Sequence, residues 1–143
     1  NTLIQDESVT SVWDVGGDMA GAKVLARYQP QLARRDCRML FVLNANRPQT
    51  ASVEIAKNYF WEIEAITGIP IGGIINNTHM CTETRLSDIE RGIVLAEKLS
   101  QRTGIPVVAH TVEKNIAQEG NLRERLGETL LPIQIYMKKP WEI

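Results

Sequence analysis

Cysteine is scarce in this sequence, which contains only Cys37 and Cys81 among its 143 residues. The two lie in different segments and form no C-x-x-C pair, so a disulfide framework is excluded and two free thiols are expected. Long apolar runs are also missing, and no charged-then-apolar leader opens the chain. These absences predict a cytoplasmic protein without a membrane partner.

A surplus of positive charge is absent as well. Lys and Arg together number 16, while Asp and Glu number 17, which gives a net charge of −1. Proteins that capture nucleic acid or anionic lipid through charge need a basic excess, so we expect no nucleic-acid partner. The hydrophobic fraction of 43% is that of an ordinary globule. The length fits a single domain over residues 1–143, or a piece of one.

Short apolar runs alternate with helical periodicity along the chain. Apolar runs predict strands at 9–14, 39–43, 71–75, 107–110 and 133–137, and apolar residues three or four apart predict helices at 20–28, 50–67 and 87–103. The uninterrupted run at 39–43 is typical of a parallel strand that is covered on both faces. The pattern predicts an α/β fold with three layers, in which helices cover both faces of a mostly parallel sheet.

Turn and cap residues support the two longer helices. The connection Thr67-Gly68-Ile69-Pro70 recurs as Thr103-Gly104-Ile105-Pro106, so the same turn chemistry is expected after both helices. Ser87-Asp88-Ile89-Glu90 predicts a capping box at the start of the later helix, and Thr50 is the expected cap of the earlier one.

Polar residues cluster where the predicted strands end. In doubly wound sheets the ligand lies beyond the carboxyl ends of the strands. Those ends carry Asp14-Val15-Gly16-Gly17, Asn44-Ala45-Asn46-Arg47, Asn76-Asn77-Thr78-His79 and His110-Thr111. Structural polar residues would be scattered over both ends, so this clustering predicts one binding site at a single edge.

The cluster that begins at Asp14 suits a triphosphate. Its carboxylate would stand at a strand tip beside Gly16 and Gly17, where backbone without side chains can approach a phosphate. Nucleotide triphosphatases hold magnesium in this way. The alternative is a strand that is followed by an ordinary glycine turn, with Asp18 as the cap of the next helix or as a second functional carboxylate.

Three of these motifs resemble a known group when they are taken in order. Asp14-Val15-Gly16-Gly17-Asp18, Asn44-Ala45-Asn46-Arg47-Pro48 and Gly73-Ile74-Ile75-Asn76-Asn77-Thr78-His79 resemble an uncharacterised bacterial family of CobQ/MinD/ParA-type P-loop ATP-binding proteins, of the SIMIBI class of NTPases. The likeness continues to Lys139-Pro140-Trp141-Glu142. It implies ATP and Mg²⁺ as cofactors, an ATPase switch in the intact protein, and a homodimer or pairing with a missing N-terminal segment.

The resemblance also implies roles for single residues. Asp14 would be the Walker B carboxylate on the magnesium side, and Gly17, next to Gly16, would sense the γ-phosphate. Asn77 would recognise the adenine edge, since an Asn amide offers both a donor and an acceptor. Asn76 is the alternative for that role. Either Asn is also explained as a residue that caps the strand end, and for Asn76 this is the preferred interpretation.

The sequence departs from the family pattern at its most important motif. No G-x-x-x-x-G-K-[ST] loop occurs, so the main cradle for the β- and γ-phosphates is missing. We therefore expect the C-terminal part of a domain, which binds ATP poorly alone. In this class the P-loop strand lies beside the Walker B strand, so its absence would leave unpaired backbone in the sheet. A separate piece, another chain or a rearranged sheet would fill that gap.

The remaining polar residues leave alternatives open. Arg47 is interpreted as an arginine finger, as a ligand for an acidic substrate group, or as the partner of an acidic neighbour. Asn44 and Asn46 belong to the same expected nucleotide-binding loop. The residues His79, Cys81, Cys37 and His110 invite a metal site, but their spacing favours structural roles. Besides the ATPase, we weigh a catalytically silent α/β protein-interaction module and a metallocentre-assembly chaperone.

Overall fold

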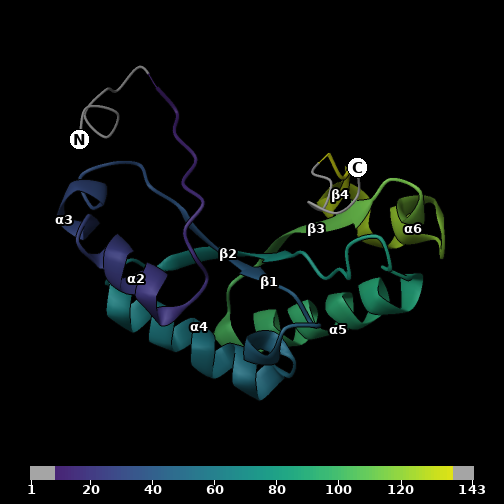
Figure 1. The fold of residues 1–143 in the computed structure, drawn as a ribbon, viewed down its shortest axis with the longest axis horizontal. Coiled ribbons are helices and arrows are strands. Elements are labelled where there is room, and N and C mark those ends of the chain that lie inside the picture. Colours follow the sequence, from purple (N-terminus) through teal and green to yellow (C-terminus); the bar gives the residue numbers. More distant parts are fainter. Residues whose placement is uncertain (1–8, 137–143) are drawn as a thin grey trace.

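The computed structural model describes residues 9–136, and its centre is a parallel β-sheet (Figure 1). The four strands are β1 (Met39–Leu43), β2 (Ile71–Asn76), β3 (Val107–Glu113) and β4 (Leu130–Ile133). They lie in the order β1-β2-β3-β4, and every neighbouring pair is parallel. The α/β class and the parallel sheet are therefore confirmed. The motif at 139–142 lies outside the described residues.

The helices connect successive strands as the sequence pattern predicts. The longest are α4 (Val53–Thr67), between β1 and β2, and α5 (Leu86–Thr103), between β2 and β3. The shorter helical segments are α2 (Met19–Ala26), α3 (Gln29–Leu32), η1 (Pro48–Thr50), η2 (Ile116–Gln118), α6 (Leu122–Leu126) and η3 (Gly127–Thr129). Among the residues described, no helix is long and apolar enough to cross a membrane.

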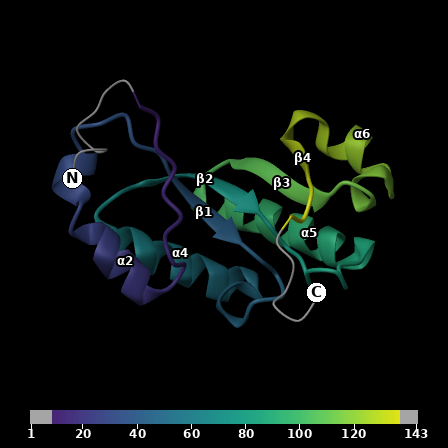
Figure 2. The ribbon, with the colours of Figure 1, turned by 45° about the horizontal axis from the view of Figure 1, so that its top comes forward.

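Helices α4 and α5 lie on one face of the sheet (Figures 1 and 2). One core cluster joins α4 and α5 to β1 and β2, and it includes Phe41, Phe60 and Ile74. A second cluster joins α5 and α6 to β3 through side chains such as Ile93 and Leu122. The rings of Phe41 and Phe60 meet edge to face, with their centroids 5.4 Å apart.

The opposite face of the sheet is open over β1. Phe41 and Leu43 are buried against the helices, whereas Leu40 and Val42 on the other face are 39% and 56% exposed. The prediction of a strand covered on both faces, and with it the third layer, is wrong for residues 9–136. A continuous apolar run indicates that both faces of a strand are apolar, but it does not indicate that helices cover both faces.

The repeated connection after α4 and α5 is confirmed. Gly68 and Gly104 end the two helices in the left-handed conformation, at φ values of 64° and 75°. In each turn the preceding threonine hydroxyl donates a bond of 2.9 Å to the carbonyl four residues earlier. The same four-residue sequence therefore makes the same turn twice.

Several predicted boundaries are wrong. The segment 9–14 is extended but belongs to no strand, and Val12 is 94% exposed, because β1 does not pair with it. The last strand is Leu130–Ile133 instead of 133–137, where residue 137 lies outside the described residues. Helix α5 begins at Leu86, with Asp88 accepting a bond from the Arg85 N–H, and the cap of α4 is Ser52 instead of Thr50.

Replacement of Gly104 should reveal the cost of its backbone conformation. No heavy atom lies within 4 Å of an added Cβ, so Gly104→Ala tests the positive φ value alone. We expect the free energy of unfolding to fall by about 1 kcal/mol, measured by urea denaturation. Gly104→Asn is the control and should lose less, because Asn tolerates this conformation better. Equal stability of wild type and Gly104→Ala would contradict the prediction.

Candidate functional site

The loops after β1 and β2 meet at the carboxyl edge of the sheet. The register pairs Leu43 with Asn76 and Asn76 with His110, so the ends of three parallel strands lie side by side. A main-chain bond of 2.8 Å from the Asn77 N–H to the Leu43 carbonyl extends the pairing into the loop. Three of the four polar clusters of the sequence are therefore brought together here, as predicted.

Asn44 fastens the first loop to its neighbours. Its side-chain amide nitrogen donates to the main-chain carbonyl of His79 at 3.2 Å. Its main-chain carbonyl accepts from the Thr50 hydroxyl at 2.6 Å. The N–H of Ala45 donates to the Thr78 hydroxyl at 3.0 Å. These bonds hold the loop against the residues that follow β2, so Asn44 supports the shape of this edge.

Asn76 is the centre of a buried polar group beneath the loops. Its oxygen accepts from the Thr78 hydroxyl at 2.7 Å, and its amide nitrogen lies 3.1 Å from Nδ1 of His110. The side chain is 1% exposed. Asn76 is therefore closed to a ligand, and the alternative of a structural residue at the strand end is correct.

Helix α5 approaches this buried group through Gly92, which sequence reasoning did not identify. A Cβ atom on Gly92 would lie 2.3 Å from Oγ1 of Thr78 and 2.6 Å from Oδ1 of Asn76. Such distances are far below van der Waals contact. A glycine one residue after a helical Arg gives no special signal, and only the packing shows why it is required.

Burial lowers the pKa of His110. The imidazole is 3% exposed, and its Nδ1 lies beside the Asn76 amide nitrogen, which is a donor. The neutral ring with an unprotonated Nδ1 satisfies this contact, whereas the charged ring would place two donors against each other. The surroundings of His110 therefore favour the neutral form.

Asn77 differs from Asn76 because its side chain is only partly buried. Its oxygen accepts a bond of 2.6 Å from the Thr111 hydroxyl. Within 9–136, no side chain or carbonyl accepts a hydrogen bond from its amide nitrogen. Asn77 therefore presents a free donor, in an orientation that Thr111 fixes, at the edge where ligands bind in parallel sheets.

Asn46 is committed to contacts with α5. Its amide nitrogen lies 3.4 Å from Oδ1 of Asp88, and its oxygen accepts a short bond from the Arg91 guanidinium. Arg91 and Asp88 form an ion pair at 2.7 Å. The pKa of Asp88 is lowered, first by the bond from the Arg85 N–H and then by Asn46 and Arg91. In this structure, Asn46 joins the β1 loop to the start of α5.

The cluster at Asp14 lies apart from the other three. The Gly17 carbonyl accepts a bond from the Tyr59 hydroxyl, and Tyr59 stands six residues after the start of α4, or about 9 Å along the helix axis. Gly16 and Gly17 are therefore beside α4 and not at a strand tip. Asp14 is exposed, and no other described residue bonds to its carboxylate. The prediction of four clusters on one edge is wrong for this one.

The structure gives contacts for Asp18 but no ion pair for Arg47 among residues 9–136. Asp18 is the N-cap of α2, and its carboxylate accepts a bond of 2.7 Å from the Gly21 N–H. The structural role is thus observed for Asp18, and no catalytic contact is seen. Arg47 is exposed, and none of the ion pairs found in the described part of the chain involves it.

Metal-binding groups are not found. Within residues 9–136, no group of three or more His, Cys, Asp or Glu side chains is arranged to hold a metal ion. Nδ1 of His79 accepts a bond of 3.2 Å from the Cys81 N–H, so it serves the loop. Cys37 and Cys81 are both free and exposed, as expected.

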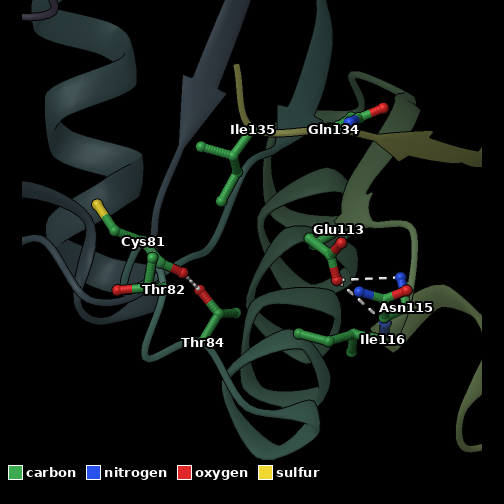
Figure 3. A pocket seen from close by; sticks show the side chains of 8 residues that line it. All are labelled: Cys81, Thr82, Thr84, Glu113, Asn115, Ile116, Gln134 and Ile135. Carbon is green, nitrogen blue, oxygen red and sulfur yellow. Dashed lines mark hydrogen bonds between the residues drawn. The ribbon is translucent and has the colours of Figure 1, made fainter. Parts of the chain in front are cut away.

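A hollow of about 430 Å³ lies beside this edge, between the loop after β2 and the end of β3 (Figure 3). It is lined by Cys81, Thr82, Thr84, Glu113, Asn115, Ile116, Gln134 and Ile135. The Glu113 carboxylate accepts a bond of 3.0 Å from the Asn115 N–H. The lining is mixed and the carboxylate is already used, so the hollow has no clear ligand chemistry of its own.

Comparison with known proteins adds no assignment. No protein-family model, curated protein or solved structure matches the chain. Any statement about its function therefore depends on the geometry above and on the sequence motifs.

The buried His110 should make the protein less stable in acid. Its pKa is lowered from the ordinary value of 6.5, so the unfolded chain binds the proton more readily than the folded one. The stability is complete above about pH 6.5 and falls below it, by at most about 1.4 kcal/mol per pH unit for one group. Urea denaturation between about pH 5 and pH 7.5 measures this slope. His110→Gln should reduce the slope, and an unchanged slope would contradict the assignment.

Proposed function

We propose that this chain is the C-terminal part of an ATP-dependent switch domain of the CobQ/MinD/ParA type, with the nucleotide at the carboxyl edge of β1, β2 and β3. The all-parallel sheet supports this proposal because ligands of such sheets bind at that edge. The observation that carries it is the free amide nitrogen of Asn77, which stands at this edge and is oriented by Thr111.

Asn77 has the chemistry to recognise adenine. Its amide nitrogen donates to a ring nitrogen, and its oxygen, which has one lone pair engaged by Thr111, keeps a second for the exocyclic amino group. Guanine carries an oxygen where adenine carries that amino group, so two acceptors would face each other. The proposed specificity for ATP over GTP follows from this difference.

Asp14 is proposed to hold Mg²⁺ through a water molecule. Gly17 lies three positions after Asp14, and three residues of extended chain span about 10 Å, so the Asp14 carboxylate stays within that reach of the Gly17 segment beside α4. One carboxylate together with substrate phosphates is an ordinary ligand set for magnesium. The residues present are therefore compatible with the metal, although they supply a single protein ligand.

Arg47, Gly16 and Gly17 are the other residues proposed to contact the phosphates of the nucleotide. Arg47 is exposed and precedes η1, where its guanidinium is available to an oxyanion. Gly16 and Gly17 offer main-chain N–H groups in a segment without side chains. Because no G-x-x-x-x-G-K-[ST] loop is present, this chain alone binds ATP weakly, and Mg²⁺-dependent hydrolysis belongs to the intact protein.

A second function is favoured by a different observation. The open face of the sheet exposes Leu40 and Val42, which suits a catalytically silent protein-interaction module. Such a module would bind no nucleotide at the carboxyl edge. The metallocentre chaperone is supported by no group of metal ligands among residues 9–136.

Asn77→Ala should weaken ATP binding and leave GTP binding unchanged. Loss of the donor and acceptor is expected to weaken the competition of ATP against a fluorescent ATP analogue by roughly fivefold to tenfold. Asn58→Ala, at an exposed position of α4, is the matched control and should compete like wild type. No competition by ATP at millimolar concentration in the wild type would support the silent module instead.

Asp14→Ala tests the magnesium assignment separately. The variant should lose the increase in ATP affinity that Mg²⁺ produces, while its binding of metal-free ATP stays near the wild-type value. The measurement is the same competition, carried out with and without Mg²⁺. Magnesium dependence that is equal in the variant and in wild type would show that Asp14 does not hold the ion.

A further inference from the structure

We propose that His110 and Asn76 form a pH-sensitive switch, which holds the loops after β1 and β2 together when His110 is neutral and releases them when it is charged. Thr78 is the residue through which both loops are held. This inference concerns the loops themselves, and it does not require that the carboxyl edge binds a nucleotide.

A directed chain of hydrogen bonds joins the two loops to His110. The Ala45 N–H donates to the Thr78 hydroxyl at 3.0 Å, and this hydroxyl donates to the Asn76 side-chain oxygen at 2.7 Å. The Asn76 amide nitrogen lies 3.1 Å from Nδ1 of His110, to which it donates when Nδ1 carries no proton. The chain therefore starts on the loop after β1, passes through the loop after β2 and ends on β3. Every donor in it points toward the imidazole.

A proton on Nδ1 of His110 would place a donor at the receiving end of this chain. Both ring nitrogens of an imidazolium are donors, so Nδ1 would then need an acceptor. Rotation of the Asn76 amide by half a turn would bring its oxygen to His110 and its nitrogen to Thr78. The Thr78 hydroxyl can accept a bond from that nitrogen. The main-chain N–H of Thr78, which now donates to the Asn76 oxygen at 3.1 Å, cannot accept one and would lose its partner.

The packing around Asn76 leaves no room for another rearrangement of its side chain. Asn76 and Thr78 are both 1% exposed. Helix α5 lies so close that a Cβ atom on Gly92 would contact the oxygens of both. The Asn76 amide can therefore turn in place but cannot move away from His110. Because an unpaired donor is costly at a buried position, Thr78 is expected to move toward water, and the Ala45 N–H loses its contact as well.

The charged groups on the elements around His110 do not stabilise its charged form. The flanking strands β2 and β4 contain no charged residue. The partly buried carboxylates of β3 and α5 already have partners, which are the Asn115 N–H for Glu113, Arg91 for Asp88, and Arg125 of α6 for Glu90. The remaining charged side chains of α5 and α6 are exposed. Burial therefore decides the direction, and it lowers the pKa of His110.

The sign of the pH dependence follows from this direction. The neutral ring belongs to the closed loops, so the loops are held together at neutral pH and are released in acid. The released state binds one more proton than the closed state. Its population relative to the closed state should therefore rise by up to about tenfold per pH unit, between the ordinary pKa of 6.5 and the lowered pKa of His110.

The test is hydrogen exchange at the amides of Ala45 and Thr78 in the wild-type chain, measured by NMR between about pH 7.5 and about pH 5. Protection factors are compared, because they correct for the pH dependence of exchange itself. Both should fall by up to about tenfold per pH unit, in step with the ring signals of His110. The amide of Phe60, in the core of α4, should keep its protection. The nitrogen signals of the neutral ring should show an unprotonated Nδ1.

His110→Asn places an amide oxygen near the position of Nδ1 and removes the titrating group. Ala45 and Thr78 should then stay protected over the whole pH interval. His79→Asn is the matched control, because His79 is the other histidine of the chain and its Nδ1 accepts a bond from the Cys81 N–H, which an Asn oxygen can also accept. The control should show the pH dependence of wild type.

Three results would overturn the proposal. The first is constant protection of Ala45 and Thr78 while the His110 ring titrates. The second is an equal loss of protection at Phe60, which would mean that the whole domain unfolds. The third is a pH dependence that disappears in His79→Asn. If His110→Asn does not fold, the wild-type titration and the His79→Asn control still distinguish these results from the expected one.

Discussion

Parallel pairing of β1, β2 and β3 is the constraint on which the rest of this structure depends. Because parallel strands end at the same edge, the loops that follow Leu43 and Asn76 must meet, and their polar residues must satisfy one another. Asn44, Thr78 and His110 do this through bonds to main chain and to Asn76. Every buried side-chain N or O atom in the described region has a hydrogen-bond partner. The edge is therefore preorganised, and most of its amides are already used.

The hydrogen bonds at this edge divide its polar residues into those that hold the loops in place and those that are free to contact a ligand. Asn76 and Asn46 hold the loops to β3 and α5. The amide nitrogen of Asn77 has no hydrogen-bond partner among residues 9–136, and Arg47 is exposed. A ligand at this edge would meet the second pair. The buried polar residues beneath this edge, on which Gly92 of α5 packs against Thr78, would keep Asn77 and Arg47 in place.

The same sheet is incomplete at its other boundary. Among the described strands β1 pairs with β2 alone, its Leu40 and Val42 side chains are exposed, and α2 packs along α4. The segment at Asp14 belongs to no strand of the described sheet, and the bond from Tyr59 to the Gly17 carbonyl holds its end beside α4.

Much of the fold could be predicted from the sequence. The strands at 39–43 and 71–75, the helices that follow them and the turns at Gly68 and Gly104 are local patterns, and local patterns are visible in a sequence. The strand at 9–14 and the helices on the second face were predicted wrongly for the described residues, because both depend on partners that apolar runs do not specify.

The position of the candidate site could be predicted from the sequence, but the contacts of its single residues could not. Its place at the carboxyl edge follows from the alternation of strands and helices, so it was predictable. The resemblance assigned the adenine role to Asn77 and left Asn76 as the alternative. The burial that distinguishes them could not be predicted, because adjacent identical residues differ only in which side of the strand they face. Two contacts join segments that are distant in the sequence, and no spacing rule predicts them. They are the packing of Gly92 on Thr78 and the bond between Arg91 and Asn46.

The most direct measurement is an NMR titration of the isotope-labelled chain with Mg-ATP and, separately, Mg-GTP. The account predicts that Mg-ATP shifts the side-chain amide signal of Asn77 and the loop signals around Arg47, and that Mg-GTP shifts them much less. A spectrum in which Mg-ATP leaves the Asn77 amide unchanged would contradict the account.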